Sequence, residues 1–197
     1  MRRIGLFGGS FDPVHRAHLA LAQSALAELR LDELRWVPAG HAYQKARALA
    51  AGRHRAAMVT LAIAGEPRFV LDASELNRAG PSYTLDTVRA AQAALPQAQW
   101  FLVIGADQYA GLHTWKEWPE LLARVTLAVA NRPGPLPAVD AQVLRAPHRV
   151  VPLPMLDISS TEVRARIAAG LPIDALVPAQ VAGYIETHAL YRGPTGS

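Results

Sequence analysis

Short apolar runs alternate with longer amphipathic stretches along the chain. The runs are bounded by turn residues and are typical of buried parallel strands, which are apolar on both faces. The predicted strands are residues 3–7, 33–37, 69–71, 100–104, 126–130 and 150–153. Between them, apolar residues recur at three- and four-residue spacings, which indicates helices. The predicted helices are residues 17–29, 53–64, 84–95, 118–124, 160–169 and 178–187.

The order of these elements predicts a fold class. Strands that alternate with helices favour an α/β fold, and we expect a single-domain, Rossmann-like, doubly wound parallel sheet with helices on both faces. We expect this domain to cover residues 1–192, and residues 193–197 to form a flexible tail. Folds of this kind bind ligands beyond the carboxyl ends of their strands, so the residues after each strand are the candidate functional positions.

Composition narrows the chemistry that the chain can perform. Hydrophobic residues make up 51% of the 197 residues, which is enough for a core, and the lack of cysteine excludes disulfides, thiolate nucleophiles and cysteine-ligated metals. The formal net charge of +4 and the isoelectric point near 9.8 favour anionic partners such as nucleic acids, acidic lipids or phosphorylated small molecules. No apolar run approaches the roughly 18 residues of a membrane span and no apolar signal core follows Met1, so we expect a soluble, cytoplasmic protein.

A glycine turn connects the first predicted strand to the first predicted helix. Gly8 and Gly9 let a ligand approach the backbone, and the free N–H groups of the following helix favour an anion such as phosphate. The turn has neither the GxxxxGK[ST] pattern of Walker loops nor the GxGxxG spacing of dinucleotide-binding folds. His15 and His18 are three residues apart, so both imidazoles lie on one side of a helical turn and can donate to phosphate. By itself, an HxxH pair is more often structural or a chance metal site.

A second candidate anion site lies near the other end of the chain, where residues 158–164 open a predicted helix. Ser159 and Glu162 form a capping box, which needs no ligand. Ser160, Thr161 and Arg164 also stand at this N-terminus, and the arginine offers a fixed charge and several donors to phosphate oxygens. The segment therefore allows either a structural cap or a phosphate site.

Three segments carry a resemblance to a known family. Residues 8–18 (GGSFDPVHRAH) resemble the GG(T/S)FDPxHxGH signature of the nucleotidyltransferase superfamily, residues 158–164 resemble its ISSTxxR signature, and residues 105–107 resemble its GxD element. Members of this superfamily move a nucleoside monophosphate from a triphosphate to an acceptor. The resemblance implies ATP contacts at Gly8, Gly9, Ser10, Phe11, Gly105, Asp107, Ile158, Ser160 and Thr161, and catalytic roles for His15, His18 and Arg164.

The middle and the end of the chain indicate the acceptor. Residues 81–84, 114–115, 132–134 and 176–192 resemble the pattern of bacterial nicotinate-nucleotide adenylyltransferases, which implies ATP and nicotinate mononucleotide as substrates. Trp115 would stack on the pyridine ring, and backbone N–H groups around Tyr83 and Thr84 would take the ring carboxylate. Arg132 and Lys45 would meet phosphate charge. Without the family, packing beside another tryptophan would be favoured for Trp115 and a place in the core for Tyr83.

Two positions depart from the family pattern. Ala17 stands where the family usually has glycine, and its methyl group could crowd the nucleotide, so we expect an effect on affinity. Residues 38–45 (PAGHAYQK) differ from the commoner family loop, although Lys45 keeps its terminal positive charge. The contacts of that loop are therefore not transferred to this chain.

The resemblance implies a mechanism without a nucleophilic side chain. The acceptor phosphate is ionised at neutral pH and attacks the α-phosphorus of ATP, while positioning and electrostatic stabilisation supply the catalysis. His18 is assigned to the α-phosphate and His15 to the phosphate chain. Ser160, Thr161 and Arg164 are assigned to the departing pyrophosphate. Mg²⁺ is expected as a cofactor held mainly by the ATP phosphates, with no metal bound by protein ligands.

Three alternatives stay open on the sequence. The acceptor could instead be nicotinamide mononucleotide or pantetheine phosphate, and the chain could be a non-catalytic nucleotide-binding module. The isoelectric point suggests a nucleic-acid binder, but the basic residues are scattered and no aromatic-basic RNA motif is present, so we expect neither nucleic acid nor membrane as a partner. Whether the chain forms a homo-oligomer is left open.

Overall fold

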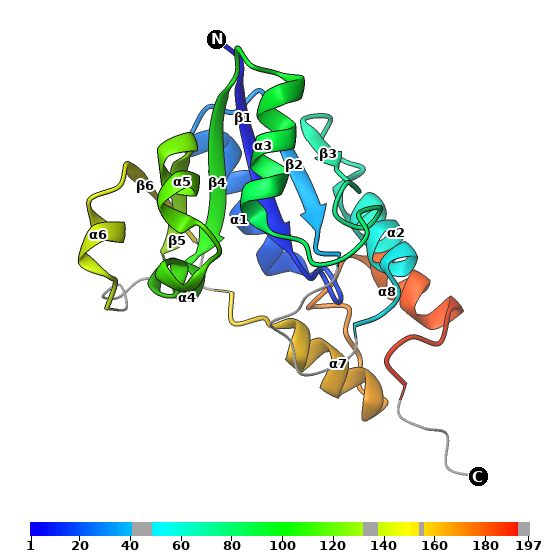
Figure 1. The fold of residues 1–197 in the computed structure, drawn as a ribbon. Helices are drawn as coiled ribbons and strands as arrows, with labels where there is room; N and C mark the ends of the chain where they lie inside the picture. The colour runs from blue at the N-terminus through cyan, green and yellow to red at the C-terminus, as the bar shows by residue number, and fades with distance from the viewer. Residues whose placement is uncertain (41–48, 132–137, 154–155, 193–197) are drawn as a thin grey trace.

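Within the residues that the structure describes, six parallel strands form a central sheet (Figure 1). The computed structural model describes residues 1–40, 49–131, 138–153 and 156–192. The strands are β1 (Arg3–Gly9), β2 (Glu33–Pro38), β3 (Phe69–Leu71), β4 (Gln99–Gly105), β5 (Thr126–Asn131) and β6 (His148–Pro152). Their order is β3-β2-β1-β4-β5-β6, and all neighbours pair in parallel. The strand order therefore reverses between β1 and β4, which is where doubly wound sheets open a crevice for ligands.

Helices cover both faces of this sheet. They are α1 (Arg16–Glu28), α2 (Gly52–Ile63), α3 (Thr84–Ala94), α4 (Ala106–Ala110), the 3₁₀ helix η1 (Leu112–Thr114), α5 (Trp118–Arg124), α6 (Ala141–Leu144), α7 (Ser160–Ala168) and α8 (Ala179–Thr187). Apolar side chains of α1, α2, α7 and α8 pack on one face, and those of α3, α4, α5 and α6 pack on the other. In Figure 1, α3 and α5 lie in front of the strands.

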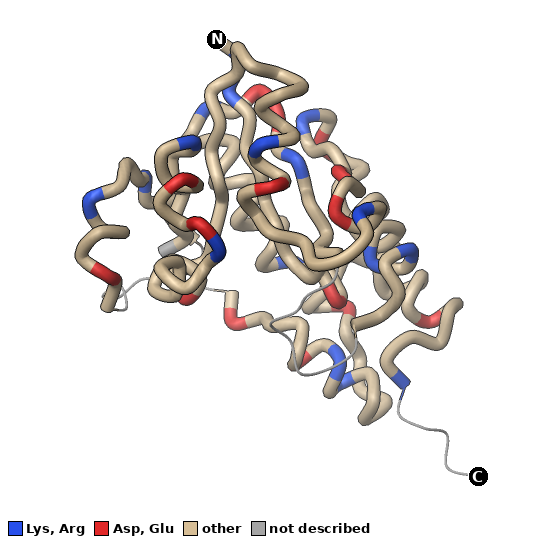
Figure 2. Tube along the Cα trace, in the orientation of Figure 1, with Lys and Arg blue, Asp and Glu red and all other residues tan. Residues whose placement is uncertain are grey.

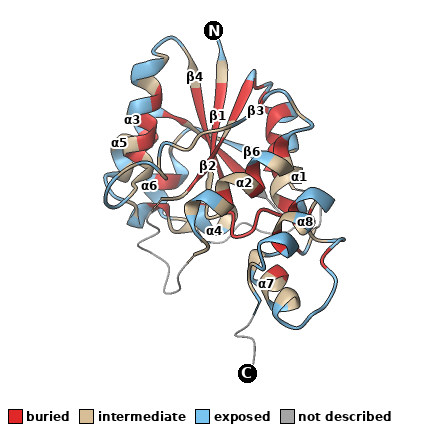
Figure 3. Cartoon of the chain, turned by 90° about the vertical axis from the view of Figure 1, so that its right-hand side faces the viewer, coloured by how far each residue is buried: buried red, intermediate tan, exposed pale blue. Residues whose placement is uncertain are grey.

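Successive residues of the central strands belong to opposite cores, as the two-residue period of a strand requires. In β4, Phe101 and Val103 face the layer that contains α1 and α2, whereas Leu102 and Ile104 face the layer that contains α3 and α5. These four side chains are at most 3% exposed. Figure 3 shows the strands buried between helices whose outer sides are exposed. Coverage on both faces explains why the strands are apolar along their whole length.

The predicted fold class, strands and longer helices are confirmed, with differences at their ends. Strand β6 covers His148–Pro152 rather than residues 150–153, because its pairing with β5 begins at His148, opposite Leu127. The hydrophobic pattern does not predict α4, η1 or α6. Segments of three to five residues are too short to display a helical period.

Charged residues are spread over the molecule. Figure 2 shows Lys and Arg interspersed with Asp and Glu along the trace. Among the residues that the structure describes, no helix is both long enough and apolar enough to cross a membrane. The predicted tail, residues 193–197, lies outside the described residues.

Candidate active site

The glycine turn lies at the carboxyl end of β1, between the ends of β2 and β4. A Cβ built on Gly8 would meet no atom within 4 Å, so this position borders open space into which a ligand can come close to the backbone. A Cβ on Gly9 would lie 2.9 Å from the ring of Phe11, so a side chain there would have to displace that ring. Phe11 itself is 1% exposed and has a positive φ of 45°, and its ring packs edge-on against Phe7. The Phe11 side chain therefore anchors the turn in the core.

His15 and His18 come together at the start of α1, as predicted. Their rings stack with centroids 3.6 Å apart, and the His15 backbone N–H donates to Nδ1 of His18 over 3.2 Å. Because Nδ1 of His18 accepts this bond, the proton of the neutral ring is on Nε2, the nitrogen that can donate to a phosphate. His15 is 6% exposed, and burial lowers its pKa to about 4. His15 is therefore neutral at physiological pH.

This burial of His15 makes stability depend on pH. The unfolded chain takes up the proton near pH 6.5, whereas the folded chain takes it up near pH 4. Between these values the unfolded state binds more protons, so the free energy of unfolding falls as the pH is lowered from 6.5 to 4, by at most about 3 kcal/mol. Urea unfolding at several pH values measures this loss. A His15→Asn variant should lose less stability than the parent over the same range, and parallel profiles of the two proteins would contradict the assignment.

The two sequence motifs are in contact, through hydrogen bonds that join residues 147 and 152 positions apart. Ser159 caps α7, and its Oγ accepts from the Glu162 N–H over 3.1 Å, which is the serine half of the predicted capping box. The Ser160 hydroxyl donates to the carbonyl of Pro13 over 2.9 Å. Nη1 of Arg164 donates to the carbonyl of Asp12 over 2.7 Å, and its Nη2 donates to the Thr161 hydroxyl over 3.1 Å. The start of α7 therefore supports the glycine turn directly.

Asp12 is a junction within this turn that sequence reasoning missed. It is fully buried, and its Oδ1 accepts from the Ala50 N–H over 3.2 Å and from the Tyr191 hydroxyl over 2.6 Å. Its peptide bond to Pro13 is cis. The end of the chain is thus tied to the turn that follows the first strand.

Arg55 is a second junction that sequence reasoning missed. It is 3% exposed, and its guanidinium donates to the carbonyls of Ser10, Ala39 and Ala50 over 2.8–2.9 Å. These carbonyls follow β1, follow β2 and precede α2. Burial lowers the pKa of Arg55, while Asp12 raises it, and the guanidinium stays charged. The sequence did offer one signal for a buried Arg55. This arginine lies on the same helix face as Met58 and Val59, which are both fully buried.

A cavity of about 200 Å³ opens beside the glycine turn. It is lined by residues from the ends of β1, β2 and β4, the start of α3 and the segment before α5. Predicted site residues in this lining are Gly8, Gly9, Ser10, Tyr83, Thr84 and Trp115. Polar lining residues that were not predicted are Glu75, Ser82, Thr87, Gln108 and Lys116. The cavity therefore joins the predicted ATP turn to the predicted acceptor residues.

Other predicted residues lie outside this lining. His15, His18, Phe11 and the start of α7 lie at the glycine turn. Ile158, which precedes the N-cap of α7, is 9% exposed and belongs to the core on the face of the sheet that α1 and α2 cover. Gly105 and Asp107 lie at the end of β4 and the start of α4, where the Gly105 N–H donates to Gln108 over 3.1 Å. Lys45 and Arg132 lie outside the described residues, so their roles stay predictions.

The chain is similar to known proteins in sequence and in fold. Residues 6–166 match the family model described as cytidylyltransferase-like. A relative from Methylibium petroleiphilum, named "Probable nicotinate-nucleotide adenylyltransferase", is 54% identical over 99% of this chain and 95% of its own length. One with the same name from Bordetella petrii is 47% identical over 98% of this chain and 100% of its own. The structure of Plasmodium falciparum nicotinic acid mononucleotide adenylyltransferase complexed with NaAD has a TM-score of 0.79 at 22% identity, covers 97% of this chain and 98% of its own, and so shows the same fold.

Proposed function

Because this chain belongs to the nicotinate-nucleotide adenylyltransferases of the cytidylyltransferase-like family, we propose that it transfers the adenylyl group of ATP to nicotinate mononucleotide. The products are nicotinate adenine dinucleotide and pyrophosphate, a step of NAD biosynthesis. The observation that best supports this function is the contact between the two phosphate motifs, in which Ser160 and Arg164 donate to the backbone of Pro13 and Asp12. That contact sets two helix N-termini, those of α1 and α7, around one turn, which favours a polyphosphate.

The reaction is an in-line displacement at phosphorus. A phosphate oxygen of the acceptor forms a bond to the α-phosphorus, and the bond from that phosphorus to the bridging oxygen of pyrophosphate breaks. The attacking phosphate is already ionised, so no general base is needed, and catalysis comes from placing the two phosphates and stabilising their charge. In this proposal, the backbone of residues 8–10 in the glycine turn contacts ATP.

Each polar group at the turn has a place in this scheme. The Nε2 proton of His18 donates to the α-phosphate, and His15 acts on the phosphate chain as a neutral imidazole. Thr161 and Arg164 stabilise the departing pyrophosphate, while the bond from Ser160 to Pro13 keeps α7 against the turn. Arg164 donates to the carbonyl of Asp12, so in this proposal the same side chain holds the turn in place and stabilises the pyrophosphate.

Mg²⁺ enters this proposal together with ATP. Phosphate oxygens are the hard ligands that Mg²⁺ prefers, and the ion would offset charge on the departing pyrophosphate. Within the described part of the chain, no group of three or more His, Asp or Glu residues forms a metal site.

The acceptor occupies the cavity in this proposal. Trp115 is partly buried against the core near Trp118 and also lines the cavity, so packing and ring stacking are compatible at this position. Thr84 is the first residue of α3, and backbone N–H groups there and at Tyr83 favour the carboxylate of the nicotinate ring.

Separate reactions with three different acceptors test the proposed function. We expect the protein with ATP and Mg²⁺ to release pyrophosphate fastest with nicotinate mononucleotide, and product mass to identify nicotinate adenine dinucleotide. Nicotinamide mononucleotide and pantetheine phosphate are the parallel reactions. A faster reaction with either of them would replace the acceptor assignment, and ATP binding without pyrophosphate release from any acceptor would favour a non-catalytic nucleotide-binding module.

A further inference from the structure

Lys116 brings a positive charge to the cavity. This charge belongs to neither of the two phosphate motifs, residues 8–18 and 158–164. Among the described residues of the lining, Lys116 is the basic side chain and Glu75 is the acidic one. The Nζ atom of Lys116 lies 4.2 Å from the centroid of the Tyr83 ring, a cation–π contact. Tyr83 directly precedes α3, so the ammonium group stands beside the proposed carboxylate site.

The backbone that carries Lys116 is held on both sides. The Trp115 N–H donates to the Leu112 carbonyl over 2.9 Å, and the Trp118 N–H donates to the Trp115 carbonyl over 3.3 Å. Glu117 adopts a left-handed conformation, with φ 51° and ψ 36°, at the N-cap position of α5. The backbone at Lys116 is therefore ordered before a ligand binds, which lowers the cost of binding.

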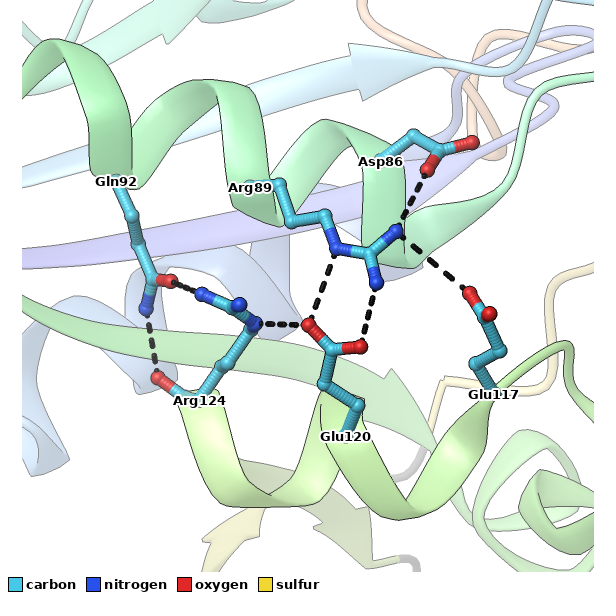
Figure 4. Close-up of polar contacts among 6 residues, drawn as sticks. All are labelled: Asp86, Arg89, Gln92, Glu117, Glu120 and Arg124. Carbon is cyan, nitrogen blue, oxygen red and sulfur yellow. Dashed lines mark hydrogen bonds and ion pairs between the residues drawn. The ribbon is translucent and has the colours of Figure 1, made fainter.

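Acidic neighbours of Lys116 are bound by arginines instead (Figure 4). Arg89 of α3 reaches Glu117 over 3.6 Å and holds both carboxylate oxygens of Glu120. Arg124 donates to Glu120 over 2.7 Å. Within the described residues, Lys116 itself forms no ion pair with a carboxylate. The same network links α3 to α5, so it also fixes the spacing between the two walls that carry Tyr83 and Lys116.

Glu75, the acidic residue of the lining, is engaged elsewhere. Its Oε1 accepts from the Thr87 hydroxyl over 2.7 Å, and Arg78 donates to that hydroxyl over 3.3 Å. Burial raises the pKa of Glu75, and the opposing contributions come from Thr87, Arg78 and the Gly40 N–H. The carboxylate therefore belongs to the wall of the cavity, and the charge of Lys116 is left for a ligand.

We propose that Lys116 is a specificity residue that pairs with the carboxylate on the pyridine ring of the acceptor and so favours nicotinate over nicotinamide mononucleotide. This inference rests on the proposed function. Trp115 and Lys116 are adjacent and both line the cavity, so a ring stacked on the tryptophan has its substituent beside the ammonium. A carboxylate gains a charge-assisted hydrogen bond there, whereas a neutral amide gains a weaker one and brings its own N–H donors toward a cation.

Kinetics with the two acceptors test this assignment, because these acceptors share the phosphate and differ at the ring substituent. We expect Lys116→Met to lower kcat/KM for nicotinate mononucleotide about tenfold, through KM, and to leave the value for nicotinamide mononucleotide within about twofold. Lys116→Arg should restore most of the preference. Arg145→Met, which removes an equal charge from an exposed position outside the cavity lining, is the matched control and should behave as the parent.

Other outcomes distinguish a failure of the Lys116 assignment from a failure of the proposed function. An equal loss with both acceptors would place Lys116 on the shared phosphate and overturn the inference, as would an unchanged ratio. If the parent protein fails to react with nicotinate mononucleotide, the proposed function itself is wrong.

Amine labelling gives a readout that does not depend on turnover. Lys45 and Lys116 are the two lysines in the sequence, so reductive methylation of the full chain followed by peptide mass analysis reports on each one separately. Nicotinate mononucleotide should slow the labelling of Lys116 more than nicotinamide mononucleotide does at equal occupancy. Equal protection by both acceptors, or none by either, would contradict the pairing.

Discussion

Replacing His18 with alanine is expected to lower kcat roughly 10²–10³-fold, the usual effect of losing one donor to a transition-state oxygen. The structure gives this donor a direction, because the His15 N–H donates to Nδ1 of His18 and so leaves the ring proton on Nε2. His18 is partly exposed and stacks on His15, so the substitution should reduce stability by no more than about 1 kcal/mol. Pyrophosphate release under saturating substrates and a thermal melt measure the two effects.

The matched control for this substitution is His188→Ala. His188 is exposed on the far end of the chain, and its ring stacks on Tyr184 with centroids 4.0 Å apart, much as the His18 ring stacks on His15. We expect this control to keep the kcat of the parent. A His18→Ala variant with near-normal kcat would remove His18 from the mechanism, whatever its melting temperature.

Arg55→Met is expected to reduce the free energy of unfolding by about 3 kcal/mol and to raise the KM for ATP. The substitution removes the donors to three carbonyls, at Ser10, Ala39 and Ala50, and takes the positive charge away from the buried carboxylate of Asp12. Two of these carbonyls belong to residues that line the cavity, so the glycine turn should lose its fixed position as well as its stability. Urea unfolding and initial rates at varied ATP concentration measure both changes.

Two further variants separate the charge of Arg55 from its geometry. Arg55→Lys keeps the charge but offers a single ammonium in place of a planar fork, so we expect an intermediate loss of stability. Arg53→Met lies two residues earlier on the same helix at an exposed position and should change stability by less than about 0.5 kcal/mol. If Arg55→Met unfolds at the same urea concentration as Arg53→Met, the three-carbonyl junction contributes nothing.

Part of the candidate site could be predicted from the sequence, because its motifs lie at the ends of strands. The glycine turn, the histidine pair and the start of α7 are each contiguous in sequence, and the carboxyl ends of parallel strands gather at one edge of a sheet. Side-chain direction was less predictable. Ser160 was assigned to a ligand, and the structure adds a bond from its hydroxyl to the carbonyl of Pro13, which no local pattern indicated. Phe11 belongs to an ATP motif, and its ring packs in the core.

The sequence alone determined the strands, the longer helices and the two phosphate motifs, because burial periodicity, helix caps and glycine turns act over a few neighbouring residues. Tertiary structure decided which distant residues share a contact. Tyr191 reaches Asp12 across 179 positions and Arg55 reaches Ser10 across 45. Lys116 meets Tyr83 where the start of α5 lies beside the start of α3. Such contacts depend on how helices dock on a sheet, and no local pattern of residues encodes that distance or direction.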